Sequence, residues 1–279
     1  MFLVETLLER MKKEQKRIVV IGDVMVDRWI HGTIGKCQDY CAKFVQGDVV
    51  SVPGGAANAA RCLSHWNLKT SLYGFADNDC PVKSRYVEEG KIVFRADDDG
   101  LATRAKGYDW ARNLSLEMLK HSAGVLLSDY DKGFLTADFI RVVADTCQKL
   151  GVPCVSDAKR EPRLYKGTII KCNGDYIEKH HCDMSSGETV IVTLGRLNPI
   201  FWDNGAANGL GIDFKPVKLV NHVGAGDCFG AHLVLGLVYG LSLKEATVLA
   251  HSAGRVYVQH EHNRPPYPQE IASDLSTAS

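Results

Sequence analysis

The residues best suited to chemistry lie between positions 221 and 230, in the run N-H-V-G-A-G-D-C-F-G. Gly224 and Gly226 permit close approach of the backbone, and Asp227 follows at once. The apolar run over residues 231–241 has the length of a buried helix. If that helix begins near Gly226, its free amides and positive dipole end favour a bound phosphate. A carboxylate there is suited to general-base catalysis, in which Asp227 takes a proton from a hydroxyl that attacks a phosphoryl group. The alternative is a helix with an acid in its first turn.

Composition limits the other classes of function. The chain has 279 residues, enough for one large α/β domain or two small ones, and its formal charge is zero. No global field attracts nucleic acid or an anionic membrane. Residues 1–16 fit an amphipathic surface helix and not a secretion signal, and no later apolar stretch is long enough to span a membrane. We therefore expect a cytoplasmic protein without a nucleic-acid or membrane partner.

The cysteines favour reduced, packed thiols over a disulfide framework. Their number is odd, they are scattered, and several lie inside apolar runs. They stand at positions 37, 41, 62, 80, 147, 154, 172, 182 and 228. Cys37 and Cys41, with His180, His181 and Cys182 elsewhere, contain residue types that bind zinc. Their spacing does not match a zinc site, and the chain has no second cysteine pair of the kind that such a site needs.

Short β-branched runs alternate with helical segments along most of the chain. Strands are expected at residues 17–23, 70–75, 124–130, 152–156, 168–171 and 189–193, with a β pair at 83–96. This alternation predicts a parallel sheet with helices on both faces. The Pro- and Ser-containing residues 263–279 predict a loose tail.

Two further segments follow strands, where open α/β sheets bind ligands. Asp23 and Asp27 come after the first strand, although an Asp at such a place is also a common turn or cap residue. Residues 54–60, G-G-A-A-N-A-A, open a helix whose small side chains let a ligand approach its amides. Asn58 would offer a donor and an acceptor to a hydroxylated ligand. Close packing of this helix on the sheet is the alternative.

Five segments, in this order, resemble the ribokinase-like family of sugar and nucleoside kinases, and most of all its subfamily that phosphorylates heptose 7-phosphate at the anomeric carbon. They are G-D-V-M-V-D-R at 22–28, P-G-G-A-A-N at 53–58, L-S-D-Y-D-K-G at 127–133, D-A-K at 157–159 and G-A-G-D at 224–227. The resemblance implies a single carbohydrate kinase domain over 1–279, with a Rossmann-type three-layer core. It also implies a small β lid at about 28–53 and 82–97, through which two subunits form a homodimer.

The same resemblance implies an activity and its residues. The expected reaction is ATP-dependent and uses Mg²⁺ to transfer the γ-phosphoryl group to a hydroxyl of a sugar or sugar phosphate, similar to heptose 7-phosphate. Asp227 is then the base, and Gly224, Ala225 and Gly226 form the anion hole. The expected sugar contacts are Asp27, Gly54, Gly55 and Asn58. The expected nucleotide contacts are Asn173, Thr193, Gly195, His251 and Lys159.

The chain departs from the family at several of these places. Tyr176 stands where a Glu usually helps to organise magnesium, so that Asp175, Glu178 or only ATP phosphates and water would hold the metal. Asn221 and Val223 replace the usual Asp and Thr before the glycine loop. Lys36 replaces the lid arginine that meets a sugar phosphate, and it would act as a point charge.

Two alternative functions stay open. A nucleoside kinase of the same fold would use lid aromatics such as Trp29 and Tyr40 to stack on a base, although such residues are as often packing. A non-catalytic protein that keeps the fold would explain Tyr176 and the apparent shortening near residues 79–83 and after Glu178.

Overall fold

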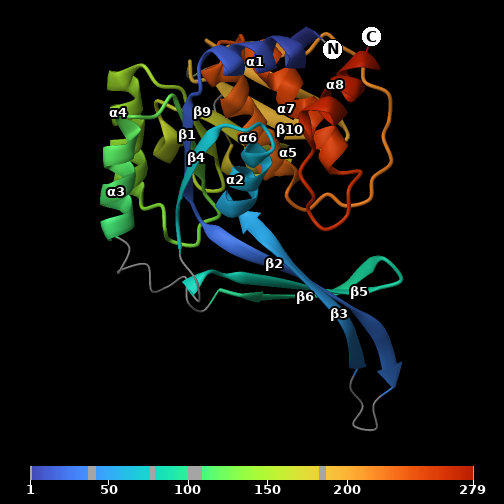
Figure 1. Ribbon diagram of the computed structural model, residues 1–279. Helices are drawn as coiled ribbons and strands as arrows, with labels where there is room; N and C mark the ends of the chain where they lie inside the picture. The colour runs from blue at the N-terminus through green and yellow to red at the C-terminus, as the bar shows by residue number, and fades with distance from the viewer. Residues whose placement is uncertain (1, 37–41, 76–78, 100–108, 182–186, 279) are drawn as a thin grey trace.

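Two β-sheets organise the chain (Figure 1). The computed structural model describes residues 2–36, 42–75, 79–99, 109–181 and 187–278. An eight-stranded sheet with helices on both faces forms the core, and a four-stranded sheet extends from it. The predicted α/β fold with a mostly parallel sheet is therefore confirmed. No helix among these residues has both the length and the apolar character needed to cross a membrane.

The core sheet brings several strand ends to one edge. Its order is β12-β11-β10-β9-β8-β7-β1-β4, and all neighbours from β10 to β4 pair in parallel. The β11–β12 hairpin continues the sheet in antiparallel pairing. The loops that follow the parallel strands lie at the same edge. The strands are β1 (Arg17–Gly22), β4 (Lys69–Tyr73), β7 (Gly124–Ser128), β8 (Cys154–Asp157), β9 (Ile169–Asn173), β10 (Val190–Leu194), β11 (Leu197–Asp203) and β12 (Ala206–Gly209).

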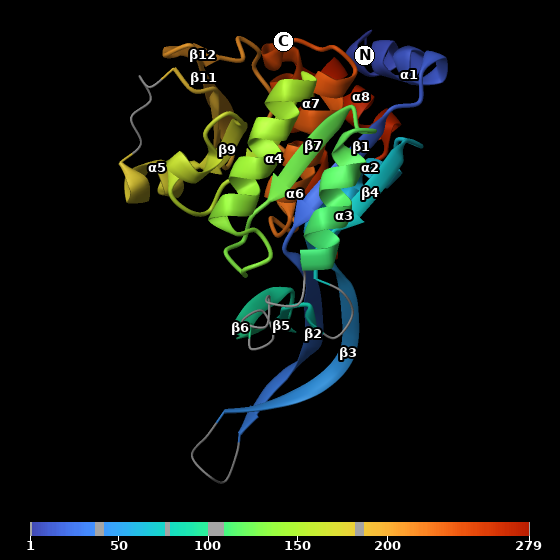
Figure 2. The ribbon, with the colours of Figure 1, turned by 90° about the vertical axis from the view of Figure 1, so that its left-hand side faces the viewer.

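Side chains of alternating direction on β1 fill two hydrophobic cores. Ile18 and Val20 belong to one cluster, and Val19 and Ile21 to the other. The first cluster lies under α1 (Phe2–Lys13), α2 (Ala56–Ser64), α6 (Ala225–Val238), α7 (Leu243–Tyr257) and α8 (Pro268–Ser276). The second lies under α3 (Asp109–Leu119), α4 (Ala137–Leu150), the short 3-10 helix η3 (Pro162–Tyr165) and α5 (Gly174–His180). Figure 2 shows α3 and α4 in front of the sheet.

The second sheet, which we call the lid, is continuous with the centre of the core. Its order is β3-β2-β5-β6, formed by β2 (Val24–Lys36), β3 (Ala42–Gly55), β5 (Val82–Glu88) and β6 (Lys91–Asp98). Only Asp23 separates β1 from β2, and β3 leads directly into α2. The ends of β2 and β3 that join the core therefore lie at the edge where the loops after the parallel strands meet, while their hairpin extends away from the core (Figure 1).

The prediction of a loose tail is wrong for residues 268–276, which form α8. Pro268 suits the first helical turn, and the Glu270 side chain accepts a hydrogen bond of 2.8 Å from the Tyr267 N–H. Ile271 is fully buried. The helix-start residues Pro268 and Glu270 lie in a segment whose Pro- and Ser-containing composition predicted a loose tail.

The described cysteines agree with the predicted reduced state. Cys62, Cys147, Cys154 and Cys228 are free and buried, and Cys80 and Cys172 are buried as well. Cys37, Cys41 and Cys182 lie outside the described residues. The described residues contain no group of three side chains that could hold a metal ion.

Candidate active site

Asp227 lies in the first turn of α6, at the edge where the strand loops meet, and its side chain is 3% exposed. The helix begins at Ala225, one residue before the predicted start. Its cap, Gly224, has φ of 83°, and a Cβ atom there would come within 2.4 Å of Tyr257 Oη. Only glycine fits both this conformation and this contact. The packing of α6 therefore requires Gly224 in front of Asp227.

Both carboxylate oxygens of Asp227 accept hydrogen bonds. Tyr130 Oη donates to Oδ1 at 2.7 Å, and Asn58 Nδ2 donates to Oδ2 at 3.0 Å. Burial and, to a smaller extent, the charge of Asp157 raise the pKa of Asp227 to about 6, against the opposing effect of the two hydrogen bonds. A fixed carboxylate with this pKa is ionised at neutral pH and basic enough to accept a proton from a hydroxyl.

Two lysines give the start of α6 a positive charge. Lys171 is nearly fully buried, and its Nζ contacts Asp157 Oδ1 at 3.0 Å, while Lys159 Nζ contacts the same oxygen at 3.2 Å. Burial opposes ionisation, but these two ammonium groups hold the pKa of Asp157 below its usual value. A Cβ atom on Gly226 would lie 2.8 Å from Lys171 Nζ. Glycine there lets an ammonium group stand directly beside the predicted anion hole.

Asp23 holds the loop that carries Tyr130. Its Oδ2 accepts hydrogen bonds from the backbone N–H groups of Tyr130 at 2.8 Å and Lys132 at 3.0 Å. Its Oδ1 accepts one from Phe134 N–H at 3.2 Å. Since Asp23 is fully buried with both oxygens engaged, the turn interpretation is correct for it and the substrate interpretation is wrong.

Asp27 forms a buried junction between lid and core. Arg85 contacts its Oδ1 at 2.6 Å, and Asn263 Nδ2 donates to its Oδ2 at 3.0 Å. A Cβ atom on Gly54 would lie 2.7 Å from Oδ2, so glycine is needed for β3 to pass this close. Gly55 is equally constrained, with φ of 55°. Predicted sugar contacts at Asp27, Gly54 and Gly55 therefore lie together, and their contact with a sugar stays a prediction.

Asn58 does not face an open ligand site as predicted. Its side chain is fully buried in α2. Besides Asp227, its Nδ2 donates to Tyr257 Oη at 3.0 Å and to the Gly224 carbonyl at 3.3 Å. The G-G-A-A-N pattern predicted that the Asn58 amide faces a ligand, but the packing of α2 against α6 buries it. Asn58 therefore links α2 to Gly224 and Asp227 at the start of α6.

Lys83 is a buried cation that the sequence reasoning missed. It is 7% exposed, and no ion pair or hydrogen bond links its Nζ to another described residue. The ammonium lies 4.5 Å from the ring centroid of Tyr130. Loss of hydration lowers its pKa, the charge of Asp27 opposes that shift, and Arg95 adds to it. The available signal was the alternation of Lys83 and Arg85 in phase with buried Val87 on β5.

The predicted nucleotide residues lie at the other end of the site. Asn173 ends β9 and caps α5 by accepting the Tyr176 N–H at 3.0 Å, and Thr193 is its partner on β10. Gly195 follows at the strand end, exposed and with φ of 62°. His251 on α7 is buried, and its Nε2 has no partner among the described residues. Burial lowers the pKa of His251 to about 4, so its ring is neutral at physiological pH.

The predicted magnesium ligands do not form a site. Asp175 and Glu178 are exposed on α5, and Tyr176, between them, is buried with its ring against His180. A neutral phenol is a poor replacement for a carboxylate on a hard cation. The described residues therefore do not fit a magnesium ion held by protein carboxylates on α5. The alternative in which phosphates and water hold the ion stays open.

Lys36 lies away from the site within one subunit. It is exposed at the end of β2, where the β2–β3 hairpin turns. Nine residues separate it from Asp27 on the same strand, which corresponds to about 30 Å of extended chain. Contact of Lys36 with the phosphate of an acceptor therefore stays a prediction. Lys83, on the neighbouring strand β5, stands in register with Asp27.

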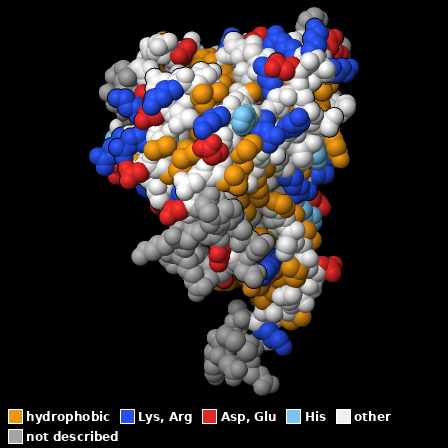
Figure 3. All heavy atoms as spheres, turned by 60° about the vertical axis from the view of Figure 1, so that its left-hand side comes forward, with side chains coloured by type: hydrophobic (Ala, Val, Ile, Leu, Met, Phe, Trp, Pro, Cys, Tyr) orange, Lys and Arg blue, Asp and Glu red, His pale blue; other side chains and the backbone are white. Residues whose placement is uncertain are grey.

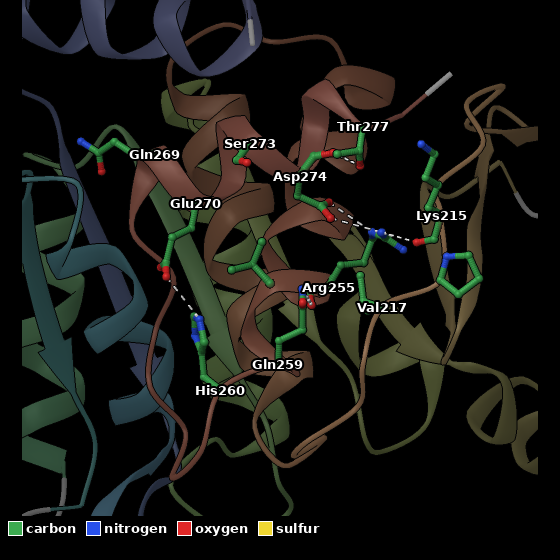
Figure 4. A pocket seen from close by; sticks show the side chains of 12 residues that line it. Lys215, Val217, Arg255, Gln259, His260, Gln269, Glu270, Ser273, Asp274 and Thr277 are labelled. Atoms are coloured by element: carbon green, nitrogen blue, oxygen red, sulfur yellow. Dashed lines mark hydrogen bonds and ion pairs between the residues drawn. The ribbon is translucent and has the colours of Figure 1, made fainter.

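A cavity of about 620 Å³ lies elsewhere, between α7, α8 and residues 215–217 (Figure 4). Arg255 crosses it, paired with Asp274 and donating to the Lys215 carbonyl at 2.6 Å. The Arg255 guanidinium also lies over Phe214, whose ring edge contacts His251. The cavity contains none of the predicted site residues, and its ion pair fastens α8 to α7.

Comparison with known proteins identifies the class. Residues 175–270, which include α6 and α7, match the pfkB family of carbohydrate kinases. The bifunctional protein HldE of Hyphomonas neptunium is 26% identical over 315 aligned residues, which cover 94% of this chain and 64% of HldE. HldE of Caulobacter vibrioides is 27% identical over 87% of this chain and 60% of its own length. The chain thus spans less than two thirds of the length of these relatives.

Solved structures share the fold at low identity. Ribokinase of Arabidopsis thaliana, in complex with ribose and ATP, aligns with a TM-score of 0.69 and 17% identity over 94% of this chain and 99% of its own. A nucleoside kinase of Methanocaldococcus jannaschii gives 0.69 and 13% over the same shares. The fold and the family match together support a carbohydrate kinase, a phosphotransferase with an alcohol group as acceptor. The chain has the ribokinase-like fold and carries a segment that matches the pfkB family, in agreement with the resemblance of its sequence motifs.

Proposed function

We propose that this chain transfers the γ-phosphoryl group of ATP to a hydroxyl of a sugar phosphate, with Asp227 as the general base. The observation that carries the proposal is the buried Asp227 carboxylate at the start of α6, with a pKa raised to about 6 by burial. It stands beside glycine backbone and the Lys171 ammonium. A base next to an anion site is what an alcohol needs to attack a phosphoryl group.

The chain's own residues divide the work. Asp227 accepts the proton of the attacking hydroxyl, and the backbone of residues 224–226 with Lys171 stabilises negative charge on the transferred group. ATP supplies that group, and Lys159 would contact its phosphates. Phosphoryl transfer depends mainly on positioning and charge stabilisation, which these fixed cations supply.

Lys83 favours a phosphorylated acceptor over a free sugar. A nearly buried ammonium without a carboxylate partner is costly, and an incoming phosphate would neutralise it. Lys83 belongs to strand β5 of the lid and lies over the Tyr130 ring, which also contacts Lys159, the residue that we assign to ATP. A heptose 7-phosphate-like acceptor fits this chemistry, and the relatives named HldE are consistent with it.

A screen of acceptors tests the reaction. The purified chain is incubated with ATP, magnesium and a panel of sugars, sugar phosphates and nucleosides, and release of ADP is measured. We expect turnover with at least one sugar phosphate and little with free sugars. Turnover with nucleosides alone would support the nucleoside kinase alternative. Binding of ATP without ADP release from any acceptor would support the non-catalytic alternative.

Trp29 gives the nucleoside alternative little support. Its side chain is buried, with the Arg85 guanidinium over its ring and the edge of His262 against it. This ring packs inside the lid root and offers no open face to a base. Tyr40 lies outside the described residues.

His251 tests the assignment of the nucleotide side. We expect His251→Ala to raise the KM for ATP roughly fivefold and to leave the KM for the acceptor unchanged, because a base would hydrogen-bond Nε2. Initial rates at varied ATP check this. His121→Ala, at an exposed histidine, is the matched control. An unchanged KM for ATP with an altered KM for the acceptor would move His251 to the other ligand.

We also propose that the lid pairs with the lid of a second copy in the cytoplasm. Hydrophobic side chains are visible along the lid in Figure 3. Those with at least two fifths of their surface exposed are Ile34, Val45, Val49, Ile92, Val93 and Phe94. An apolar patch of this kind typically marks an interface.

Charge placed on the lid tests this pairing. We expect Phe94→Glu to convert a dimer into a monomer at micromolar concentration, as measured by sedimentation velocity, because Phe94 is 61% exposed. Leu150→Glu, at an exposed leucine of α4, should leave the dimer intact. A wild-type chain that sediments as a monomer at every concentration would contradict the proposal.

A further inference from the structure

Tyr130 is fixed at both its backbone and its phenol. Its backbone N–H donates to Asp23 Oδ2 at 2.8 Å, and its Oη donates to Asp227 Oδ1 at 2.7 Å. It comes from the loop after β7, whereas Asp227 belongs to α6. Asn58 holds the other oxygen of Asp227. The two donors therefore fix the plane of the carboxylate from opposite oxygens.

The ring of Tyr130 also joins lid and core. Lys83 Nζ, from β5 of the lid, lies 4.5 Å from the ring centroid, and Lys159 Nζ, after β8 of the core, lies 5.3 Å from it. Both ammonium groups lie over the ring, where the negative π face attracts cations. A change in the position of Lys83 therefore changes the contacts of Tyr130, the residue that donates a hydrogen bond to Asp227.

We propose that Tyr130 is a positioning residue that keeps Asp227 ionised and oriented and that couples the lid to the catalytic base through Lys83. This inference rests on the proposed function of Asp227. Each carboxylate oxygen has two lone pairs, so the hydrogen bond from Tyr130 leaves room for one from an acceptor hydroxyl. Binding of an anionic acceptor to Lys83 would then fix the position of the Tyr130 ring. The ring, through its hydroxyl, would fix the orientation of the Asp227 carboxylate.

Tyr130 stays a donor throughout the working pH range. Removal of its phenol from water raises its pKa above the ordinary value, and the charge of Asp227 raises it further. Its hydrogen bond in turn stabilises the ionised form of Asp227 and opposes the effect of burial. Without the phenol, the pKa of Asp227 should therefore rise. The other titratable or polar groups that face Asp227 are Asn58, Lys83, Asp157, Lys159, Lys171, Cys228 and Tyr257.

The test compares pH profiles of kcat/KM for the wild-type chain and Tyr130→Phe. Since the base must be ionised, kcat/KM rises with pH through the pKa of Asp227. We expect the acidic limb of the variant to lie about one pH unit higher, because a hydrogen bond to a charged group is lost. At pH 6 the rate should fall roughly fivefold, and at pH 8 most of that loss should be recovered. The KM for the acceptor should stay close to the wild-type value, because the ring remains under Lys83.

Two further variants separate positioning from a structural role. Tyr130→Leu removes the ring and should also raise the KM for the acceptor, because Lys83 loses its platform. Ring-fluorinated tyrosine at position 130 keeps the shape but donates more strongly, so its acidic limb should move to lower pH. Thermal melting and ATP affinity confirm that each variant is folded.

The outcomes distinguish this inference from the proposed function. An acidic limb that stays in place in both Tyr130→Phe and the fluorinated protein overturns the role of Tyr130, even if Tyr130→Phe is slower at every pH. Limbs that move in opposite directions support it. Normal turnover by Asp227→Asn would instead overturn the base assignment itself.

Discussion

Asp227→Asn should lower kcat by at least ~10²-fold, within the ~10²–10⁴-fold range that a positioned base contributes. Asparagine matches the shape of the carboxylate and can still accept from Tyr130, but it cannot take a proton from the acceptor hydroxyl. The dissociation constants for ATP and acceptor should change little, since asparagine has the size of the buried Asp227 and leaves the surrounding contacts to each ligand in place. Steady-state ADP release and titration calorimetry measure the two effects separately.

Stability supplies the control for this variant. The pKa of Asp227 is about 6, above its ordinary value of 3.8, because burial disfavours the charged form. The stabilisation from its protonated form is therefore complete below the ordinary value and is lost as pH rises through about 6. At pH 8 the Tm of Asp227→Asn should equal or exceed that of the wild type, and the advantage should shrink at pH 5. An inactive variant with a lower Tm at pH 8 would indicate damage to the fold and not loss of a base.

Lys83→Met should raise the KM for a sugar phosphate roughly 10- to 100-fold, because one charge-assisted hydrogen bond to phosphate is lost. Methionine keeps the length of the side chain and packs against Tyr130 without charge. The KM for ATP should stay unchanged, since Lys159 and Lys171 keep their contacts with Asp157. Initial rates at varied acceptor concentration check the expectation.

Lys36→Met is the matched control for Lys83. It removes the same charge from an exposed lid position away from the site. We expect its kinetics to match the wild type. If Lys36→Met impaired use of the acceptor and Lys83→Met did not, the phosphate would have to bind at the hairpin end of a lid. The acceptor site would then include residues of a second subunit.

The sequence was sufficient for the fold and for the start of α6. The runs at 17–23, 152–156 and 168–171 predicted parallel strands with their loops at one edge, and the structure has β1, β8 and β9 there, each parallel to its neighbours in the sheet. The G-A-G-D segment placed the start of α6 within one residue. Such features are local, because glycine conformations and β-branched runs reflect the chain's own geometry.

The rest depended on tertiary contacts that no local pattern records. Asn58 was expected to face a ligand, but the crossing of α2 and α6 buries its amide under Asp227. Lys83 resembles an ordinary polar residue of an exposed strand until β5 pairs with β2 and turns it toward Tyr130. Lys36 carries the same charge, yet its register at the end of β2 takes it away from the site. The position of each lysine along its strand, more than its residue type, decides whether it lies near Tyr130, as Lys83 does, or far from it, as Lys36 does.

Transfer of a radiolabelled γ-phosphoryl group tests the central claim most directly. Wild-type chain and Asp227→Asn are incubated with labelled ATP, magnesium and a sugar phosphate, and the products are separated. We predict label in a sugar bisphosphate for the wild type and almost none for the variant, with ATP bound by both. Label that appears only as inorganic phosphate, or equally in the products of both proteins, would contradict the assignment of Asp227 as the base of a sugar-phosphate kinase.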